Sequence, residues 1–268
     1  MFKQIQSAQN ETYKMLESLL ASKGIKKERR FLLFGEKAIA ELTQEMPERI
    51  FAIVTTSHYL EKAESLLQSL SSDSHERMTK MRTVHGYELH PPLFQELDVF
   101  GTRAPFAVVD CPQLQEFTGD KAPAGLEIIT NLQDPSNLGA LIRSAAAFDA
   151  TVVLLKDCAN PFHPKSTRAA SGTLFKVHLM QAPGLEEILM QKTVKNTLWG
   201  LDAKGTNIFD FQFPKNMRLV IGQEGAGIHS QLKEQSLAIP MQNGVESLNA
   251  MVSASLAMFQ YRGQHRTN

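Results

Sequence analysis

The sequence predicts an α/β protein with a mostly parallel β-sheet in its second half. Short apolar runs alternate with segments of helical periodicity along both halves of the chain, as in sheets that are covered by helices on both faces. Residues 111–125 are polar and marked by Pro and Gly, so we expect a linker between two domains there. In the second half, several apolar runs lead directly into loops rich in Gly, Asn and Asp. Ligands of open α/β sheets bind at such strand ends.

Residues 1–110 have the length of a compact α/β domain. An amphipathic helix is expected near its start, because Tyr13, Leu16 and Leu19 recur at helical spacing. The polar run LSSDSHER, residues 70–77, is expected to be an exposed loop. The other expected elements are strands at 31–35, 50–56 and 105–110 and helices at 36–42, 59–70 and 93–97.

The second domain is expected over residues 126–268. A dinucleotide-binding Rossmann fold is the alternative, but no GxGxxG follows the first strand of this half, and its Gly-rich element comes late. The expected strands are 126–130, 151–155, 177–180, 197–201, 217–221 and 237–239, and the expected helices are 137–148, 185–192 and 248–261.

The junction between the first strand and helix of this domain is the most informative stretch. It reads NLQDPSNLGALIRSAAAFDA from Asn131 to Ala150. The residues from Asp134 to Asn137 supply turn and N-cap chemistry, and apolar residues then recur at helical spacing. Arg143 is expected in the second turn of this helix, near the carboxyl end of the strand. A guanidinium at that place suits a phosphate or another anion.

Two later segments are also strand-to-loop junctions. LVIGQEGAGI, residues 219–228, is an apolar strand that runs into a Gly-rich loop. IPMQNGVESLNAMVSASLAMFQY, residues 239–261, is a short strand end, a polar loop and a long apolar helix.

In this order and spacing, the three segments resemble the three motifs of the SpoU class of the SPOUT superfamily, which are S-adenosylmethionine-dependent RNA ribose 2′-O-methyltransferases. The resemblance covers residues 126–261 specifically and includes RAASGTLFKV at 168–177. Residues 1–110 more loosely resemble the small substrate-binding domain of many members. The matching positions are Asn131, Asp134, Pro135, Asn137, Gly139 and Arg143, then Gly222, Glu224, Gly225 and Gly227, then Pro240, Met241, Gly244, Ser247, Leu248 and Asn249.

The resemblance implies a trefoil-knotted C-terminal domain whose loops hold S-adenosylmethionine without a metal. It places the cofactor at Gly222, Gly225, Ile239 and Leu248. The implied catalytic residues are Arg143, Asn131, Glu224, Ser247 and Asn249. Because arginine is a poor proton acceptor, we interpret Arg143 as an anchor for the phosphate beside the target hydroxyl. That phosphate or a water then takes the proton.

Charge and composition bear on the partner. Lys+Arg and Asp+Glu are equal at 28 each, but nucleic-acid binding needs only a local positive surface. Ribosomal RNA is the expected substrate, because a separate N-terminal domain is present; a transfer RNA methyltransferase and a catalytically silent RNA-binding or ribosome-assembly protein are the alternatives. The expected RNA contacts are Lys23, Lys26, Lys27, Arg29 and Arg30, together with Arg168.

Other features narrow the class of protein. Cys111 and Cys158 have no metal-site spacing, and His163 is interpreted as an ordinary loop residue. No apolar run is long enough for a membrane span and the start of the chain lacks a signal-peptide core, so a cytoplasmic protein is expected. A homodimer is expected, because the helix at 248–261 is apolar on more than one face.

Overall fold

The computed structural model of the protein describes residues 2–72, 83–222 and 227–265. The chain divides into two compact units. Unit 1 comprises residues 1–112 and 160–172, and unit 2 comprises residues 113–159 and 173–268. A segment from the second half of the chain therefore belongs to the N-terminal unit.

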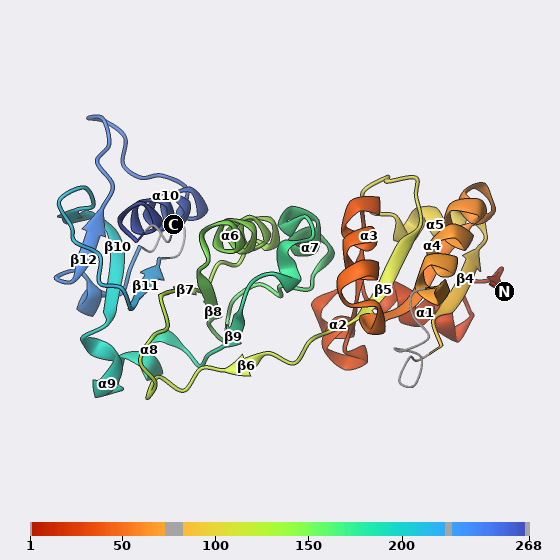
Figure 1. Ribbon diagram of the computed structural model, residues 1–268, viewed down its shortest axis with the longest axis horizontal. Helices are drawn as coiled ribbons and strands as arrows, with labels where there is room; N and C mark the ends of the chain where they lie inside the picture. Colours follow the sequence, from red (N-terminus) through yellow and green to blue (C-terminus); the bar gives the residue numbers. More distant parts are fainter. Residues whose placement is uncertain (1, 73–82, 223–226, 266–268) are drawn as a thin grey trace. The chain divides into compact units, whose positions relative to one another are not determined.

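Unit 1 is built on a five-stranded mixed sheet of order β1-β4-β3-β5-β2 (Figure 1). Strands β1, β4 and β3 are parallel, whereas β5 is antiparallel to β3 and to β2. The strands are β1 (Lys3–Ile5), β2 (Arg30–Leu33), β3 (Ile50–Thr56), β4 (His85–Leu89) and β5 (Phe106–Asp110), and the helices are α1 (Glu11–Ser18), α2 (Ser22–Glu28), α3 (Glu36–Glu45), α4 (Leu60–Ser72), α5 (Pro91–Leu97) and α7 (Pro164–Ala170).

The helix α7 packs on β2 of this sheet. The rings of Phe162 and Phe31 lie 5.3 Å apart between centroids, and the hydroxyl of Thr167 donates to the carbonyl of Leu32 at 3.4 Å. Phe162 and Thr167 are both buried. These contacts explain why residues 160–172 belong to unit 1.

Unit 2 contains a seven-stranded sheet of order β12-β10-β11-β7-β8-β9-β6. Every strand pair in it is parallel, which confirms the predicted sheet. The strands are β6 (Gln115–Glu116), β7 (Leu126–Thr130), β8 (Thr151–Leu154), β9 (Leu179–Gln181), β10 (Leu198–Asn207), β11 (Met217–Ile221) and β12 (Ser236–Ala238).

Helices cover both faces of this sheet (Figure 1). On one face lie α6 (Pro135–Phe148) and α10 (Ala250–Gln264), which pack against each other. On the other face, α8 (Leu185–Leu189) and α9 (Lys192–Lys195) bury Ile188 and Val194 against sheet residues such as Ile129 and Val220. No helix in the described ranges is long and apolar enough to cross a membrane. The trefoil knot stays a prediction.

Several expected boundaries differ from the structure. Helix α6 begins at Pro135 and not at 137, because Asp134 is the N-cap: its carboxylate accepts the Asn137 N–H at 2.8 Å. The helix expected at 185–192 is two short helices, α8 and α9. Strand β6 lies within the expected linker, and it pairs with β9. Strands β1 and β4 and the helices α2 and α7 were not expected.

A buried ion pair joins the amino-terminal halves of β7 and β11. Arg218 and Glu127 are register partners, and their side chains meet at 2.8 Å with 2% and 8% of each exposed. The guanidinium also donates to the hydroxyl of Thr197 and the carbonyl of Lys121, and it lies over the ring of Phe117. Removing a guanidinium from water costs free energy, and these partners together offset that cost.

Candidate active site

Four neighbouring strands of unit 2 end at one edge of the sheet. Because β7 and β11 are parallel and Thr130 pairs with Ile221, the residues that follow them, Asn131 and Gly222, leave adjacent strands together. Strand β10 aligns with the same edge, since Gly200 pairs with Val220. Strand β12 follows on the other side of β10. This is the carboxyl edge, where parallel sheets bind ligands.

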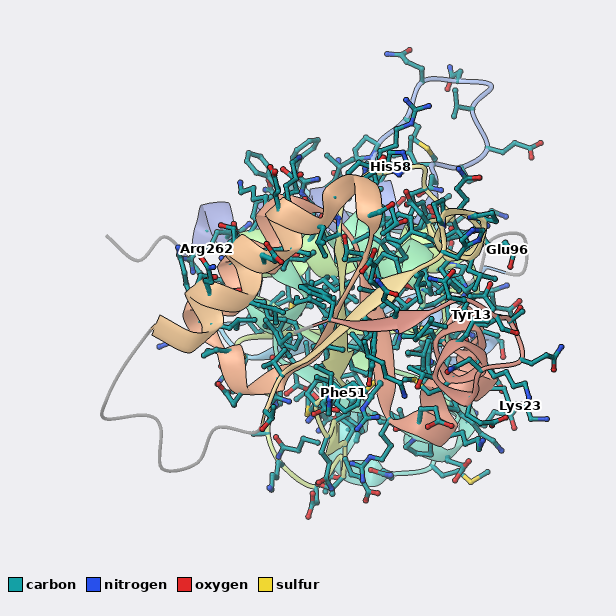
Figure 2. All side chains as sticks on the ribbon, turned by 90° about the vertical axis from the view of Figure 1, so that its right-hand side faces the viewer. Tyr13, Lys23, Phe51, His58, Glu96 and Arg262 are labelled. Atoms are coloured by element: carbon teal, nitrogen blue, oxygen red, sulfur yellow. The ribbon has the colours of Figure 1, made fainter. Side chains whose placement is uncertain are left out.

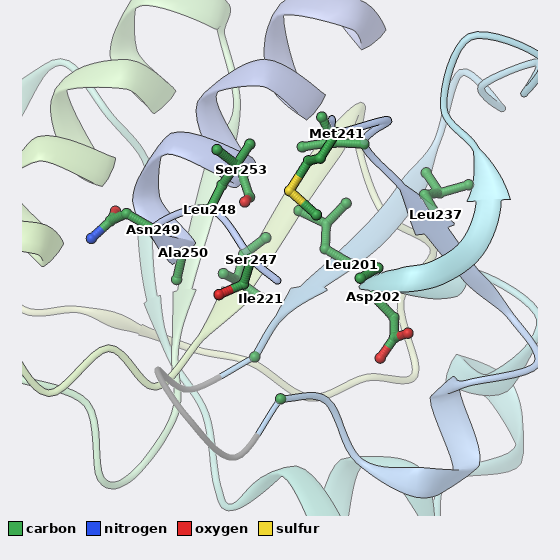
Figure 3. A pocket seen from close by; sticks show the side chains of 14 residues that line it. Leu201, Asp202, Ile221, Leu237, Met241, Ser247, Leu248, Asn249, Ala250 and Ser253 are labelled. Carbon is green, nitrogen blue, oxygen red and sulfur yellow. The ribbon is translucent and has the colours of Figure 1, made fainter. Parts of the chain in front are cut away.

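A pocket of about 430 Å³ opens at this edge (Figure 3). That volume lies in the range of small-molecule and cofactor sites. Most of its walls are apolar or small, with a few polar groups. Its lining residues are Leu201, Asp202, Ala203, Ile221, Gly222, Gly227, Leu237, Ile239, Met241, Ser247, Leu248, Asn249, Ala250 and Ser253.

Two glycines form a narrow neck beside the pocket. A Cβ at Gly222 would lie 2.6 Å from the backbone carbon and oxygen of Gly227, closer than a side chain can approach. Gly227 itself has φ of +69°, which favours glycine. The backbone on both sides of residues 223–226 can therefore come together only with glycine at position 222.

The start of α10 forms another wall of the pocket. Asn249 is the N-cap of this helix: its side-chain oxygen accepts the N–H groups of Met251 and Val252 at 2.9 and 3.3 Å. The cap fixes the direction in which the preceding loop, with Ser247 and Leu248, meets the helix. The site thus depends on a helix cap for its shape.

Helix α6 lies next to α10. The hydroxyl of Ser255 on α10 donates to that of Ser144 on α6 at 2.9 Å. The neighbouring side chain, Arg143, is exposed. The sequence placed Arg143 in the second turn of this helix. Because α6 begins at Pro135, Arg143 is in the third turn instead.

Comparison with known proteins identifies the fold and the family. Residues 127–259 match the SpoU rRNA Methylase family. This part of the chain belongs to that family. It is 34% identical to the ribosomal RNA small subunit methyltransferase G 2 of Syntrophobacter fumaroxidans over 97% of its own length, but it spans only 49% of that relative.

A second relative is similar from end to end. It is the 23S rRNA (guanosine(2553)-2′-O)-methyltransferase RlmP of Bacillus subtilis, 27% identical over 97% of this chain and 100% of the relative. Among solved structures, an AdoMet-bound rRNA methyltransferase from Sinorhizobium meliloti has a TM-score of 0.78 at 20% identity, covering 100% of this chain and 99% of that one. These matches extend over both units of the SpoU chain.

The SpoU pocket brings together most of the residues expected at the cofactor. Gly222, Ile239 and Leu248 line it, and so do Ser247 and Asn249, which were expected to act on the substrate. Asn131 is half-buried at the adjacent strand end, and Arg143 is not among the lining residues. Glu224 and Gly225 lie outside the described residues.

Sequence reasoning missed Asp202, Met241 as a lining side chain, and Ser253. Asp202 follows the apolar start of β10 and is followed by Ala-Lys-Gly. The signal that could have found it is the same one that identified the other junctions, an apolar run that ends in Asp and Gly. The register of β10 against β12 shifts between Leu201 and Thr206, and both Leu201 and Asp202 line the pocket at the start of this irregularity.

His163, Cys111 and Cys158 lie outside the pocket, and each is at least partly buried. His163 is the N-cap of α7, where its Nδ1 accepts the N–H of Lys165 at 3.2 Å; partial burial, together with the nearby Lys165 charge, lowers its pKa. Burial raises the pKa of the thiols of Cys111 and Cys158 to about 12. The described part of the chain holds no cluster of three or more His, Cys, Asp or Glu suited to a metal.

Only some of the basic side chains expected to contact RNA in unit 1 are exposed. Lys23, Lys26, Lys27 and Arg29 are exposed on and just after α2, and Lys23 stands at the surface (Figure 2). The half-buried Arg30 instead forms a 3.0 Å ion pair with Asp110 and stacks on Phe51, 3.4 Å from its centroid. Arg168 is exposed on α7, and its guanidinium lies 5.8 Å from the ring centroid of Phe100.

Proposed function

We propose that the protein methylates a ribose 2′-hydroxyl of RNA with S-adenosylmethionine as the methyl donor, and that its substrate is ribosomal RNA. The observation that carries the proposal is the pocket at the carboxyl edge of the SpoU domain, which residues of the second and third family motifs line and beside which the first motif begins at the end of β7. Relatives named as 23S rRNA 2′-O-methyltransferases support the reaction and the substrate class.

The pocket residues fit this donor. The partly exposed apolar side chains of Leu201, Met241 and Leu248 offer a surface for a purine ring, and the backbone at Gly222 and Ile239 offers hydrogen-bonding groups beside it. When bound, the donor supplies a methyl group attached to a positively charged sulfonium sulfur, and this sulfur leaves as a neutral thioether when the methyl group is transferred. A SpoU relative whose structure is described as a complex with AdoMet supports this assignment.

The remaining roles belong to polar side chains around the pocket. Ser247 and Asn249 position the ribose at the pocket rim, and Asn131 orients the loop after β7. Arg143 holds the phosphate next to the target hydroxyl bidentately. The hydroxyl proton passes to that phosphate or to water, since a guanidinium does not accept it at neutral pH. Glu224 is proposed to orient the cofactor loop.

Unit 1 supplies the wider RNA contact. The exposed cations of α2 and Arg168 on α7 are proposed to meet the phosphate backbone. Both lie in the same unit, because α7 packs on β2. Residues 1–110 are therefore proposed to act as the substrate domain together with 160–172, and the reaction is proposed to take place in the cytoplasm.

Calorimetric titration with S-adenosylmethionine tests the cofactor first. Saturable binding without added metal is expected, and the absence of binding would favour the silent RNA-binding alternative. Mapping of 2′-O-methyl groups in ribosomal and transfer RNA from a deletion strain then tests the substrate. Loss of one ribosomal site is expected, whereas loss of a transfer RNA site would overturn the assignment to ribosomal RNA.

A homodimer is part of the proposal. Val252, Leu256 and Phe259 on α10 are 39%, 42% and 62% exposed. Such a group of exposed apolar side chains on one helix face is unfavourable in water and is typical of a protein–protein contact. We expect Phe259→Asp with Leu256→Asp to shift the mass measured by light scattering from dimer to monomer. A wild-type protein that is monomeric at micromolar concentration and still methylates RNA would contradict the dimer.

A further inference from the structure

Asp202 is the only charged side chain among the described residues that line the pocket. It is half-buried, and it lies in β10 just after Leu201, whose side chain is part of the apolar wall. A carboxylate beside an apolar surface is costly unless donors meet it. Its surroundings therefore indicate which part of a ligand lies there.

The protein satisfies only part of this carboxylate. Oδ1 accepts the N–H of Lys204 at 2.9 Å, which fixes the side chain in a local turn. No described residue forms a salt bridge or a further hydrogen bond with it. An ionised carboxylate can accept about four hydrogen bonds, so the bound ligand can supply several donors at this point.

The carboxylate lies on the opposite side of the pocket from Asn249 (Figure 3). Asn249 is on the side at which the target ribose is proposed to bind, so the methyl group of the donor faces that side. Asp202 consequently meets a part of the donor other than its methyl. Among the parts that remain, the ribose is bonded directly to the purine, and Asp202 directly follows the apolar Leu201 that suits a purine.

We propose that Asp202 recognises the ribose diol of the methyl donor, with its carboxylate accepting hydrogen bonds from the 2′- and 3′-hydroxyls. The inference rests on the proposed function, because it assumes that a nucleoside cofactor occupies the pocket. Carboxylates recognise ribose hydroxyls in this way in other nucleotide-binding folds. Asp202 thus makes the site selective for ribonucleosides over deoxynucleosides.

Calorimetry with three probes tests the proposal on the full-length chain. S-adenosylhomocysteine has both the diol and the amino-acid ammonium, 5′-methylthioadenosine has only the diol, and 3′-deoxy-5′-methylthioadenosine lacks one hydroxyl. We expect Asp202→Ala to weaken the first two by a similar factor, roughly tenfold or more. Its effect on the deoxy probe is expected to be clearly smaller, since one hydrogen bond to that probe is already missing.

Two further variants make the result interpretable. Asp202→Asn keeps one oxygen for the Lys204 N–H and replaces the other with an NH2 group, which can donate to a hydroxyl oxygen but cannot accept from it, so its loss of affinity is expected to be smaller than that of Asp202→Ala. Asp210→Ala removes an exposed carboxylate that does not line the pocket and is expected to change no affinity.

The outcomes separate the proposal from the function on which it rests. If Asp202→Ala weakened S-adenosylhomocysteine but not 5′-methylthioadenosine, the carboxylate would face the ammonium and the proposal would be overturned. Equal affinities in the variant and the wild type would also overturn it. If the wild-type protein bound neither probe, the proposed cofactor itself would be wrong.

Discussion

Asn249 and Arg143, both expected to act on the substrate, have different structural surroundings. The Asn249 side chain caps α10, so its position at the pocket follows from ordinary helix chemistry. Arg143 does not cap a helix end, since it is exposed in the third turn of α6, and it does not line the pocket. Its guanidinium is therefore suited to a ligand that reaches the site from solvent, as RNA does.

Arg143→Ala is expected to lower the rate of methyl transfer by about 100-fold or more, because a misplaced ribose hydroxyl reacts poorly. S-adenosylmethionine affinity is expected to stay nearly unchanged. Single-turnover methylation assays and calorimetry measure the two effects, and Arg143→Lys keeps the charge without the bidentate geometry as a control. Loss of cofactor binding with intact RNA binding would reverse the assigned roles.

His163→Ala is expected to leave methylation intact and to lower the free energy of unfolding by about 1 kcal/mol, as for other helix N-caps. The cap needs an unprotonated Nδ1, and the lowered pKa of His163 means that the unfolded chain binds this proton more readily. The stabilisation is therefore present above the unfolded pKa, about 6.5, and is lost as the pH falls below it. Urea unfolding at pH 8 and pH 5 measures both. A variant that folds normally but fails to methylate would make His163 catalytic.

At the scale of elements, the buried pair between β7 and β11 holds together the two central strands whose carboxyl ends carry Asn131 and Gly222. Glu127→Gln leaves the Arg218 charge buried without a carboxylate, and we expect a loss of about 3–5 kcal/mol in unfolding free energy. The double variant Glu127→Leu with Arg218→Met is expected to recover much of that loss. Chemical denaturation measures the cycle, and a single-variant cost below about 1 kcal/mol would show that the pair is dispensable.

Local pattern was enough for some elements and not for others. Strands β7 and β11 match their expected bounds, 126–130 and 217–221, because five consecutive buried residues are flanked by turn residues. Strand β6 is only Gln115–Glu116, so it exists through its pairing with β9 and leaves no periodic signal. Helix α7 belongs to unit 1 through contacts across about 130 residues of sequence, which no local pattern reports.

The site divides in the same way. The three motif loops could be located from strand ends followed by Gly, Asn and Ser. Asp202 carries the same signal, an apolar run that ends in Asp and Gly, but its place at the pocket depends on the pairing of β10 with β11 and β12. The ion pair that engages Arg30 also depends on tertiary structure, since its partner, Asp110, is 80 residues away.

For the whole molecule, α7 decides how the role of the N-terminal unit has to be tested. Deleting residues 1–112 would remove β2 and leave the buried side chains of Phe162, Thr167 and Ala170 without their partners. A truncated protein would therefore lose stability together with its cations. Removing charge from the intact chain separates the two effects.

The variant Lys23→Gln/Lys26→Gln/Lys27→Gln is expected to weaken RNA binding without changing the melting temperature, because all three side chains are exposed. Each phosphate contact that is lost lowers the slope of log K against log salt by roughly 0.7–0.9, so a decrease of about 2–3 is expected if all three bind phosphate. S-adenosylmethionine affinity should not change, since the pocket lies in unit 2. The control is Lys14→Gln/Lys62→Gln, two exposed lysines of unit 1 that lie outside α2 and pair with Glu11 and Glu36, as Lys27 pairs with Glu28. This variant should leave the slope nearly as it is. An unchanged slope in the triple variant would show that α2 does not contact the RNA. Equal decreases in both variants would show that the slope depends only on net charge.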